Sequence, residues 1–263
     1  PVLTSRPLAR GALGRLGVAA AMAAALLAGA AAPAFADDAA FSDGQKDAIG
    51  GIVKDYLMAH PEVVREALQE LQRRDQEAEE AAKRANLAKY EDQLFNSGKQ
   101  VVLGNPNGDV TLVEFFDYNC GYCKRSHADM KRLLEEDKNL KIVLKEFPVL
   151  GQGSEEAAQV AVIVHEMAPE KYGAFHDELL MTRGEVNGAV AADIGLDPEA
   201  VKARLKEQIV GETISESFGL AQALGINGTP TYVLKGDVVV GAVGYDTLKD
   251  KIKSVRECGK ATC

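Results

Sequence analysis

A buried-strand pattern runs directly into a pair of cysteines that opens a helix. Residues 110–116 form a nearly continuous apolar run, and Cys120 and Cys123 follow at the start of a helical pattern that continues to about residue 136. A cysteine at such a junction lies beside the unpaired N–H groups and the positive dipole end of the helix, which stabilise a thiolate. We therefore expect Cys120 to be a nucleophile and Cys123, one turn inside the helix, to be the resolving thiol.

The chain from residue 98 onward predicts an α/β domain. Strand-like and helical segments alternate, and several helices over about 152–224 separate the first strands from the last two. This order places a helical unit inside a small mixed sheet. The expected elements are strands at 100–103, 110–116, 140–147, 231–234 and 238–243, and helices at 120–136, within 154–224 and at 245–256.

Residues 1–36 read as an export signal. Three arginines precede an Ala/Leu-rich run over 16–32, and an Ala-Phe-Ala triplet ends at Ala36. The apolar run is short for a membrane-spanning helix, which needs about 20 apolar residues. We expect cleavage after Ala36 and delivery to the periplasm, with an uncleaved membrane anchor as the alternative.

The charge of the mature chain excludes some partners. Removal of the signal takes away three arginines and no acid, which changes the formal net charge from −9 to −12. An acidic surface of this kind repels nucleic acid and anionic lipid. We therefore expect no nucleic-acid partner.

Residues 37–97 predict a helical extension before the catalytic domain. Apolar residues recur at helical spacing on both sides of a break at His60-Pro61, and the segment 72–84 is charged, with only alanines between the polar residues. An apolar stripe without a core of its own needs a partner surface. We expect self-association, as a dimer or trimer, through residues 43–72; packing of these helices on their own catalytic domain is the alternative.

Two motifs carry a resemblance to a known family. The segment Val-Glu-Phe-Phe-Asp-Tyr-Asn-Cys-Gly-Tyr-Cys at 113–123 resembles the active-site segment of DsbA-like thiol:disulfide oxidoreductases, and Gly-Thr-Pro-Thr at 228–231 resembles the cis-proline loop of that family. The resemblance covers about residues 98–257. It implies a thioredoxin fold with a DsbA-type helical insertion and a cis peptide bond before Pro230. The backbone of Thr229 would then be available to pair with an extended substrate peptide beside Cys120.

Glu114 is an acid inside an otherwise apolar strand. Burial would raise its pKa and let it exchange protons with Cys123, and similar proteins carry an acid at this position. The alternative is a partly exposed edge glutamate paired with Lys145. His127, one turn beyond Cys123, is expected to be a solvated residue on the flank of its helix.

The residues between the cysteines bear on the direction of the reaction. Tyr122 cannot add the positive charge that a histidine would place beside the thiolate, so we expect a milder oxidant than a dedicated oxidase. Gly-Tyr with Thr229 before the proline resembles the DsbC-type isomerase site, and the N-terminal extension resembles ScsC-type and Com1-like proteins. The sequence thus predicts a thiol:disulfide oxidoreductase or isomerase. It would act on exported proteins with a membrane redox partner, and no cofactor or resident metal is expected.

Cys258 and Cys263 form a second close pair in the C-terminal tail, residues 258–263. We expect a local structural disulfide, with a second redox pair that passes electrons to Cys120 as the alternative. Two other functions stay open. One is copper handling through Cys120, Cys123 and His127, whose side chains are soft ligands; the other is a non-catalytic role in envelope assembly.

Overall fold

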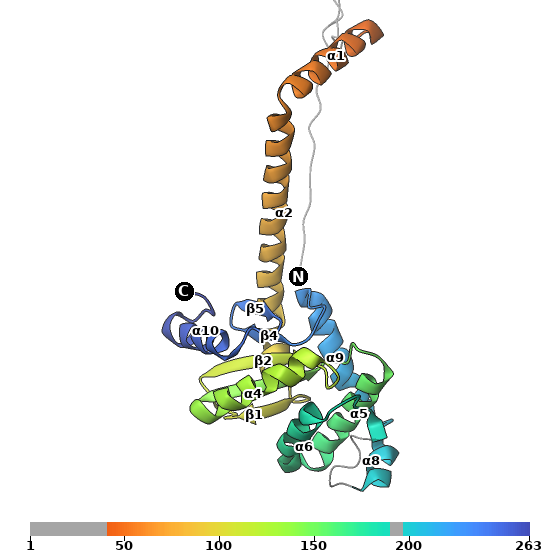
Figure 1. Ribbon diagram of the computed structural model, residues 1–263, viewed down its shortest axis with the longest axis vertical. Helices are drawn as coiled ribbons and strands as arrows, with labels where there is room; N and C mark the ends of the chain where they lie inside the picture. The colour runs from red at the N-terminus through yellow and green to blue at the C-terminus, as the bar shows by residue number, and fades with distance from the viewer. Residues whose placement is uncertain (1–40, 190–196) are drawn as a thin grey trace, which may run out of the picture. The chain divides into compact units, whose positions relative to one another are not determined.

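The computed structural model describes residues 41–189 and 197–263 (Figure 1). The predicted signal segment 1–36 lies outside the described residues. Contacts divide the chain into an N-terminal unit that ends at Val64 and a larger unit of residues 65–263. Among the described residues, no helix has the length and apolar character needed to span a bilayer.

The N-terminal unit is helical, as predicted. Helix α1 (Asp43–Ala59) begins with a capping box, in which the Ser42 and Gln45 side chains each accept a hydrogen bond from the other residue's backbone N–H. Helix α2 (Pro61–Lys89) starts at proline. Proline suits this position because the N–H groups of the first helical turn have no acceptor within the helix, so the absence of one breaks no hydrogen bond. Helix α1 buries none of its residues, and its large apolar side chains other than Leu57 are exposed.

A five-stranded mixed sheet forms the centre of the larger unit, with strand order β1-β3-β2-β4-β5. Only β2 and β3 are parallel; each of the other neighbouring pairs is antiparallel. The strand that carries the apolar run, β2, therefore lies in the interior of the sheet. The strands are β1 (Val101–Gly104), β2 (Val110–Phe116), β3 (Leu140–Glu146), β4 (Thr231–Leu234) and β5 (Asp237–Val240).

Helices cover both faces of this sheet (Figure 1). Leu112 and Phe116 of β2 pack in one apolar cluster with α4 (Gly121–Glu136) and α10 (Tyr245–Cys258). Val113 and Phe115 point to the other face and pack with α3, α9 and the end of α2. Because successive side chains of a strand point to opposite faces, one apolar run supplies both cores. The remaining helices are α3 (Glu91–Phe95), α5 (Gln152–Met167), α6 (Pro169–Met181), α8 (Pro198–Arg204) and α9 (Gln208–Leu224).

The fold is a thioredoxin-like α/β fold with N-terminal helices and a helical insertion between β3 and β4, as predicted. The sequence placed the last strand at 238–243, but it ends at Val240. Gly241 follows with a φ of +88°, which takes the backbone out of the extended conformation.

The C-terminal cysteines form the expected local disulfide, Cys258–Cys263, at the end of α10. Inside the closed loop, Ala261 is buried, and its N–H donates to the Lys235 carbonyl at 3.2 Å. The disulfide thus holds the tail against the turn between β4 and β5.

Replacing both tail cysteines by serine should lower the free energy of unfolding by about 2 kcal/mol, the loop-closure value for a six-residue loop. Urea denaturation with an unchanged m-value would measure this loss. We expect disulfide-exchange activity to be retained; its disappearance in the folded variant would instead identify Cys258 and Cys263 as a second redox pair.

Candidate active site

Cys120 is the N-cap residue of α4, at the point where the chain leaves β2. Its pKa is lowered to about 5, first by interaction with the Cys123 thiol and then by Thr229 and the backbone at residues 122 and 123. Desolvation opposes this shift. A thiol with such a pKa is a thiolate at neutral pH, which is the nucleophilic form.

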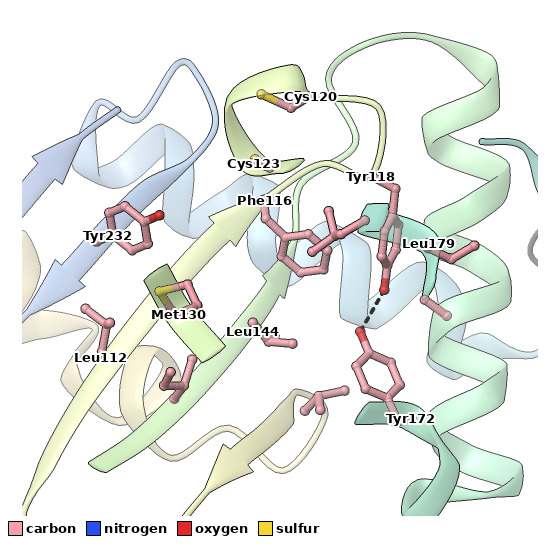
Figure 2. Packing of buried hydrophobic residues seen from close by; sticks show 14 of the residues in the cluster. Leu112, Phe116, Tyr118, Cys120, Cys123, Met130, Leu144, Tyr172, Leu179 and Tyr232 are labelled. Carbon is pink, nitrogen blue, oxygen red and sulfur yellow. Dashed lines mark hydrogen bonds between the residues drawn. The ribbon is translucent and has the colours of Figure 1, made fainter. Parts of the chain in front are cut away.

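Cys123 behaves in the opposite way. Its pKa is raised, first because its thiol hydrogen-bonds to Cys120, then by burial and by the charge of Glu114. Cys123 exposes 1% of its surface and Cys120 exposes 6%, so solvent reaches the site mainly at Cys120. Figure 2 shows both cysteines at the end of the core formed by Phe116 and Tyr232. The pair therefore combines an ionised sulfur with one that keeps its proton.

The loop before β4 faces this pair. The Thr229–Pro230 peptide bond is cis, as the resemblance implies, and in its thiol form Cys120 Sγ donates to the Thr229 carbonyl oxygen at 3.1 Å. The Gly241 N–H donates to the Pro230 carbonyl at 2.9 Å, so the end of β5 holds the loop in place. The structure thus brings together the predicted site residues Cys120, Cys123, Thr229 and Pro230.

Glu114 lies below the cysteines in β2 and is 4% exposed. Burial raises its pKa to about 8, the nearby Cys120 charge adds to the rise, and interaction with Tyr232 opposes it. The charge of Glu114 contributes to the raised pKa of Cys123. Glu114 is thus a buried acid that stays protonated near neutral pH.

The alternative of an edge glutamate paired with Lys145 is wrong. Strand β2 lies between β3 and β4, and Lys145 pairs in register with Phe115, which points to the opposite face from Glu114. The Lys145 ammonium instead donates to Glu216 Oε1 at 2.9 Å and to the Gln93 carbonyl at 2.7 Å. The carboxylate of Glu216, not that of Glu114, neutralises this buried lysine.

The expectation of a solvated His127 is also wrong. Helix α6 of the insertion covers this flank of α4, so His127 is 7% exposed, with its ring 5.6 Å from that of His176. No three His, Cys, Asp or Glu side chains among the described residues are grouped to hold a metal ion, so Cys120, Cys123 and His127 form no such set.

Two polar residues before Cys120, Asp117 and Asn119, fix the active-site loop, although the sequence alone did not indicate this role. The buried Asp117 carboxylate accepts the backbone N–H groups of Asn119, Val149 and Leu150 at 2.7, 2.8 and 3.0 Å, and the Ser154 hydroxyl at 2.7 Å. The Asn119 side chain exchanges hydrogen bonds with the backbone of Val186 at 2.6 and 2.8 Å. In the sequence, Asp117 and Asn119 are marked only by their position, as polar residues between an apolar strand and a cysteine.

A second buried acid lies behind this loop. Glu146 accepts hydrogen bonds from Tyr172 at 2.9 Å and from Tyr118 at 3.3 Å, and the two hydroxyls are 3.1 Å apart (Figure 2). Burial raises its pKa well above the ordinary range. Glu146 therefore acts as a neutral structural group that ties the insertion to β3.

Comparison with known proteins agrees with this geometry. The DSBA-like thioredoxin domain matches residues 111–253, and the copper resistance protein ScsC N-terminal domain matches residues 45–78. The disulfide bond formation protein D of Bacillus subtilis is 26% identical over 168 residues, which cover 59% of this chain and 76% of that protein.

Solved structures extend the likeness. A thioredoxin-like oxidoreductase from Silicibacter pomeroyi is 41% identical, with a TM-score of 0.61 over 64% of this chain and 98% of that one. Proteus mirabilis ScsC in a transitional conformation is 29% identical, with a TM-score of 0.60 over 82% of this chain and 97% of that one. The latter match includes part of the N-terminal helical segment as well as the thioredoxin-like domain.

Alkylation of the reduced protein with iodoacetamide should follow a single fast thiol with an apparent pKa of about 5. In Cys123→Ala the apparent pKa should rise, because the Cys123 thiol is the largest cause of the depression and alanine donates no hydrogen bond. Mass mapping of the labelled cysteine across pH 4–9 would measure both values. A fast thiol that titrates with an ordinary pKa of about 8.5 would contradict the assignment.

Glu114→Gln should stabilise the reduced protein, and the gain should grow as pH rises from about 4.5 to about 8. In this window the unfolded glutamate is ionised while the folded one keeps its proton, so wild-type stability falls with pH relative to the variant. The difference should reach the order of several kcal/mol. Urea denaturation at a series of pH values measures it, with the surface variant Glu155→Gln as control; a gain independent of pH would show that Glu114 does not titrate there.

Proposed function

The chain belongs to the DSBA-like thioredoxin domain family, and from this premise we propose that it is a periplasmic thiol:disulfide oxidoreductase that rearranges the disulfides of exported proteins. The observation that carries the proposal is the asymmetric cysteine pair, with Cys120 ionised and Cys123 protonated beside Glu114. The Cys120 thiolate attacks a substrate disulfide, and a mixed disulfide forms as the substrate's other sulfur leaves as a thiolate. That thiolate can then attack another disulfide of the same substrate, and a substrate thiolate finally attacks the mixed disulfide and releases Cys120 as a thiolate. Alternatively, Cys123 attacks the Cys120 sulfur, which releases the reduced substrate and leaves the pair oxidised.

The surroundings of Cys120 support isomerisation or mild oxidation. The two residues between the cysteines are Gly121 and Tyr122, so no imidazolium lies between the two sulfurs. The Tyr122 side chain is 59% exposed, and the Arg125 guanidinium stacks on its ring at 4.2 Å. A thiolate that is ionised at neutral pH remains available to start exchange in the reduced enzyme. The fixed Thr229 backbone supports strand-like pairing with an extended substrate chain.

Exposed apolar side chains border this site. Val149 and Leu150 are 39% and 54% exposed on the loop that Asp117 holds, and Tyr122 is exposed between the cysteines. Met181 is 64% exposed at the end of α6, where Lys124 binds the next carbonyl, that of Thr182, at 2.8 Å. Apolar side chains of this kind suit incompletely folded substrates, which expose their own apolar residues.

We further propose that the protein is a homo-oligomer, a trimer or dimer, assembled through residues 43–72. The match to the ScsC N-terminal domain over residues 45–78 supports this assembly. So do the exposed apolar side chains of this segment, because a soluble chain buries such a stripe against a partner. They are Ile49, Ile52, Val53, Tyr56, Met58, Val64, Leu68 and Leu71.

The periplasmic location and a membrane redox partner are part of the same proposal. The predicted signal segment over 1–36 supports export, and the Cys258–Cys263 disulfide fits an oxidising compartment. A partner that resets Cys120 and Cys123 is required by the chemistry, since each net oxidation or reduction of substrate leaves the pair in the opposite state.

Copper handling is the second candidate, and the match of residues 45–78 to the copper resistance protein ScsC N-terminal domain favours it. The reduced pair Cys120 and Cys123 offers two soft ligands. Titration of copper(I) into the reduced protein, with the double serine variant of this pair as control, tests it. Tight binding that depends on the two cysteines would support this function, and equal binding by the variant would exclude it.

The mature protein, residues 37–263, should reactivate scrambled ribonuclease in a glutathione buffer. Cys120→Ser should abolish this activity, whereas the double serine variant of Cys258 and Cys263 should keep it. Wild-type protein that folds but reactivates no ribonuclease would favour the non-catalytic role in envelope assembly.

Ile52→Asp should disrupt the oligomer and reduce isomerase activity several-fold more than its reaction with small disulfides. Lys54→Asp, which adds an acid to α1 outside the apolar set, is the matched control. Light scattering measures the mass of each variant. A wild-type monomer, or unchanged isomerase activity in an Ile52→Asp monomer, would contradict the proposed role of residues 43–72.

A further inference from the structure

A small cavity adjoins Glu114 between β2, α4 and α6. Its volume is about 30 Å³, and its lining includes Glu114, His127, Lys131, His176 and Asp177. A buried water needs only about 10–15 Å³ of such volume and 2–4 polar partners. The cavity therefore has room and polar partners for one water molecule beside the carboxyl group that serves Cys123.

His127 connects this cavity to the surface. Its Nε2 atom lies 3.1 Å from Asp177 Oδ1, although the two are not aligned for a hydrogen bond. The Asp177 side chain is 29% exposed, and its other oxygen pairs with Lys131 at 2.6 Å. The order Glu114, cavity, His127, Asp177 thus runs from the buried acid to solvent.

His176 is a poor proton carrier, although it lines the same cavity. Burial, and then the nearby His127, lower its pKa to about 3, and its Nδ1 atom lies 3.3 Å from the Tyr118 hydroxyl. Burial also lowers the pKa of His127 and Lys131 adds to this, but Asp177 opposes both effects. Of the two imidazoles, His127 is the one that a neighbouring carboxylate assists in taking a proton.

The proposed exchange reaction moves a proton inside the protein. In the mixed disulfide the Cys120 charge is gone, and Glu114 first releases its own proton toward solvent. The S–H proton of Cys123 then passes to the resulting Glu114 carboxylate, and the Cys123 thiolate attacks the Cys120 sulfur. The bond between Cys120 and the substrate sulfur breaks, and the substrate leaves as a thiolate that takes a proton from solvent. Glu114 must then return its proton to solvent, and the groups that face it on the active-site side, Cys123, Cys120 and Tyr232, are themselves buried.

We propose that His127, paired with Asp177, carries this proton between Glu114 and solvent through a water molecule in the cavity. The inference rests on the proposed exchange activity. His127 touches neither the substrate nor the reacting sulfurs, so it acts on the reaction only through Glu114. The prediction is that the resolving step depends on His127 while the first attack by Cys120 does not.

The test separates these two steps by stopped flow. Reduced mature protein is mixed with oxidised glutathione from pH 6 to 9. Attack by Cys120 is timed in a Cys123→Ser background, and resolution is timed by closure of the Cys120–Cys123 disulfide. His127→Gln should slow resolution about tenfold at pH 7, a fraction of what direct general acid–base catalysis supplies. The deficit should shrink above pH 8, where hydroxide removes protons without the histidine.

His165→Gln is the matched control, because His165 is also a histidine with a buried nitrogen that lacks a hydrogen-bond partner, yet it lies outside this cavity. It should resolve at the wild-type rate. Asp177→Asn, a change at a partly exposed position, should slow resolution in the same direction and keeps the test valid if His127→Gln fails to fold.

Three results would overturn the inference: wild-type resolution in both His127→Gln and Asp177→Asn, equal losses in His127→Gln and His165→Gln, or an equal loss in the first attack. Each leaves the exchange activity intact. Wild-type protein that forms no disulfide with oxidised glutathione would instead overturn the proposed function itself.

Discussion

The site depends on holding one negative charge on sulfur in a place that is almost closed to water. Cys120 is 6% exposed, and desolvation alone would raise the pKa of its thiol. The charge is stable because Cys120 caps α4, where N–H groups lack helical partners, and because the Cys123 thiol donates to it. Strand β2 leads directly into the start of α4, and the two cysteines lie one helical turn apart. Both features stabilise the negative charge on Cys120.

The protonation states of Cys120, Cys123 and Glu114 depend on one another in this buried site. With Cys120 ionised, Cys123 and Glu114 both keep their protons near neutral pH, because a second negative charge nearby would be costly. The proton balance reverses when Cys120 becomes part of a mixed disulfide, since its charge disappears. Cys123 and Glu114 then no longer face a thiolate, and deprotonation of the resolving thiol becomes easier.

The sequence predicted the elements whose signals are local. The apolar run, the cysteine pair, the proline break after His60 and the Gly-Thr-Pro-Thr loop each carry their signal within a few residues, and each was placed correctly. The burial of Glu114 could not be predicted, because the sequence of an edge strand and that of a central strand can show the same apolar pattern. Only the strand order distinguishes them. His127 was misjudged for a similar reason: the helix that covers it, α6, comes about 40 residues later in the chain. Asp117 was missed because its partners, the N–H groups of Val149 and Leu150, lie beyond the next strand.

The end of α2 joins the catalytic unit on the sheet face opposite the thiol site. Leu87, near the end of α2, packs with Phe115 and Val233 on the sheet face opposite α4, and Asn86 donates to the Ala223 carbonyl at 2.6 Å. Both cysteines belong to the cluster on the other face. The base of α2 is therefore anchored to a surface that contributes nothing to the thiol site.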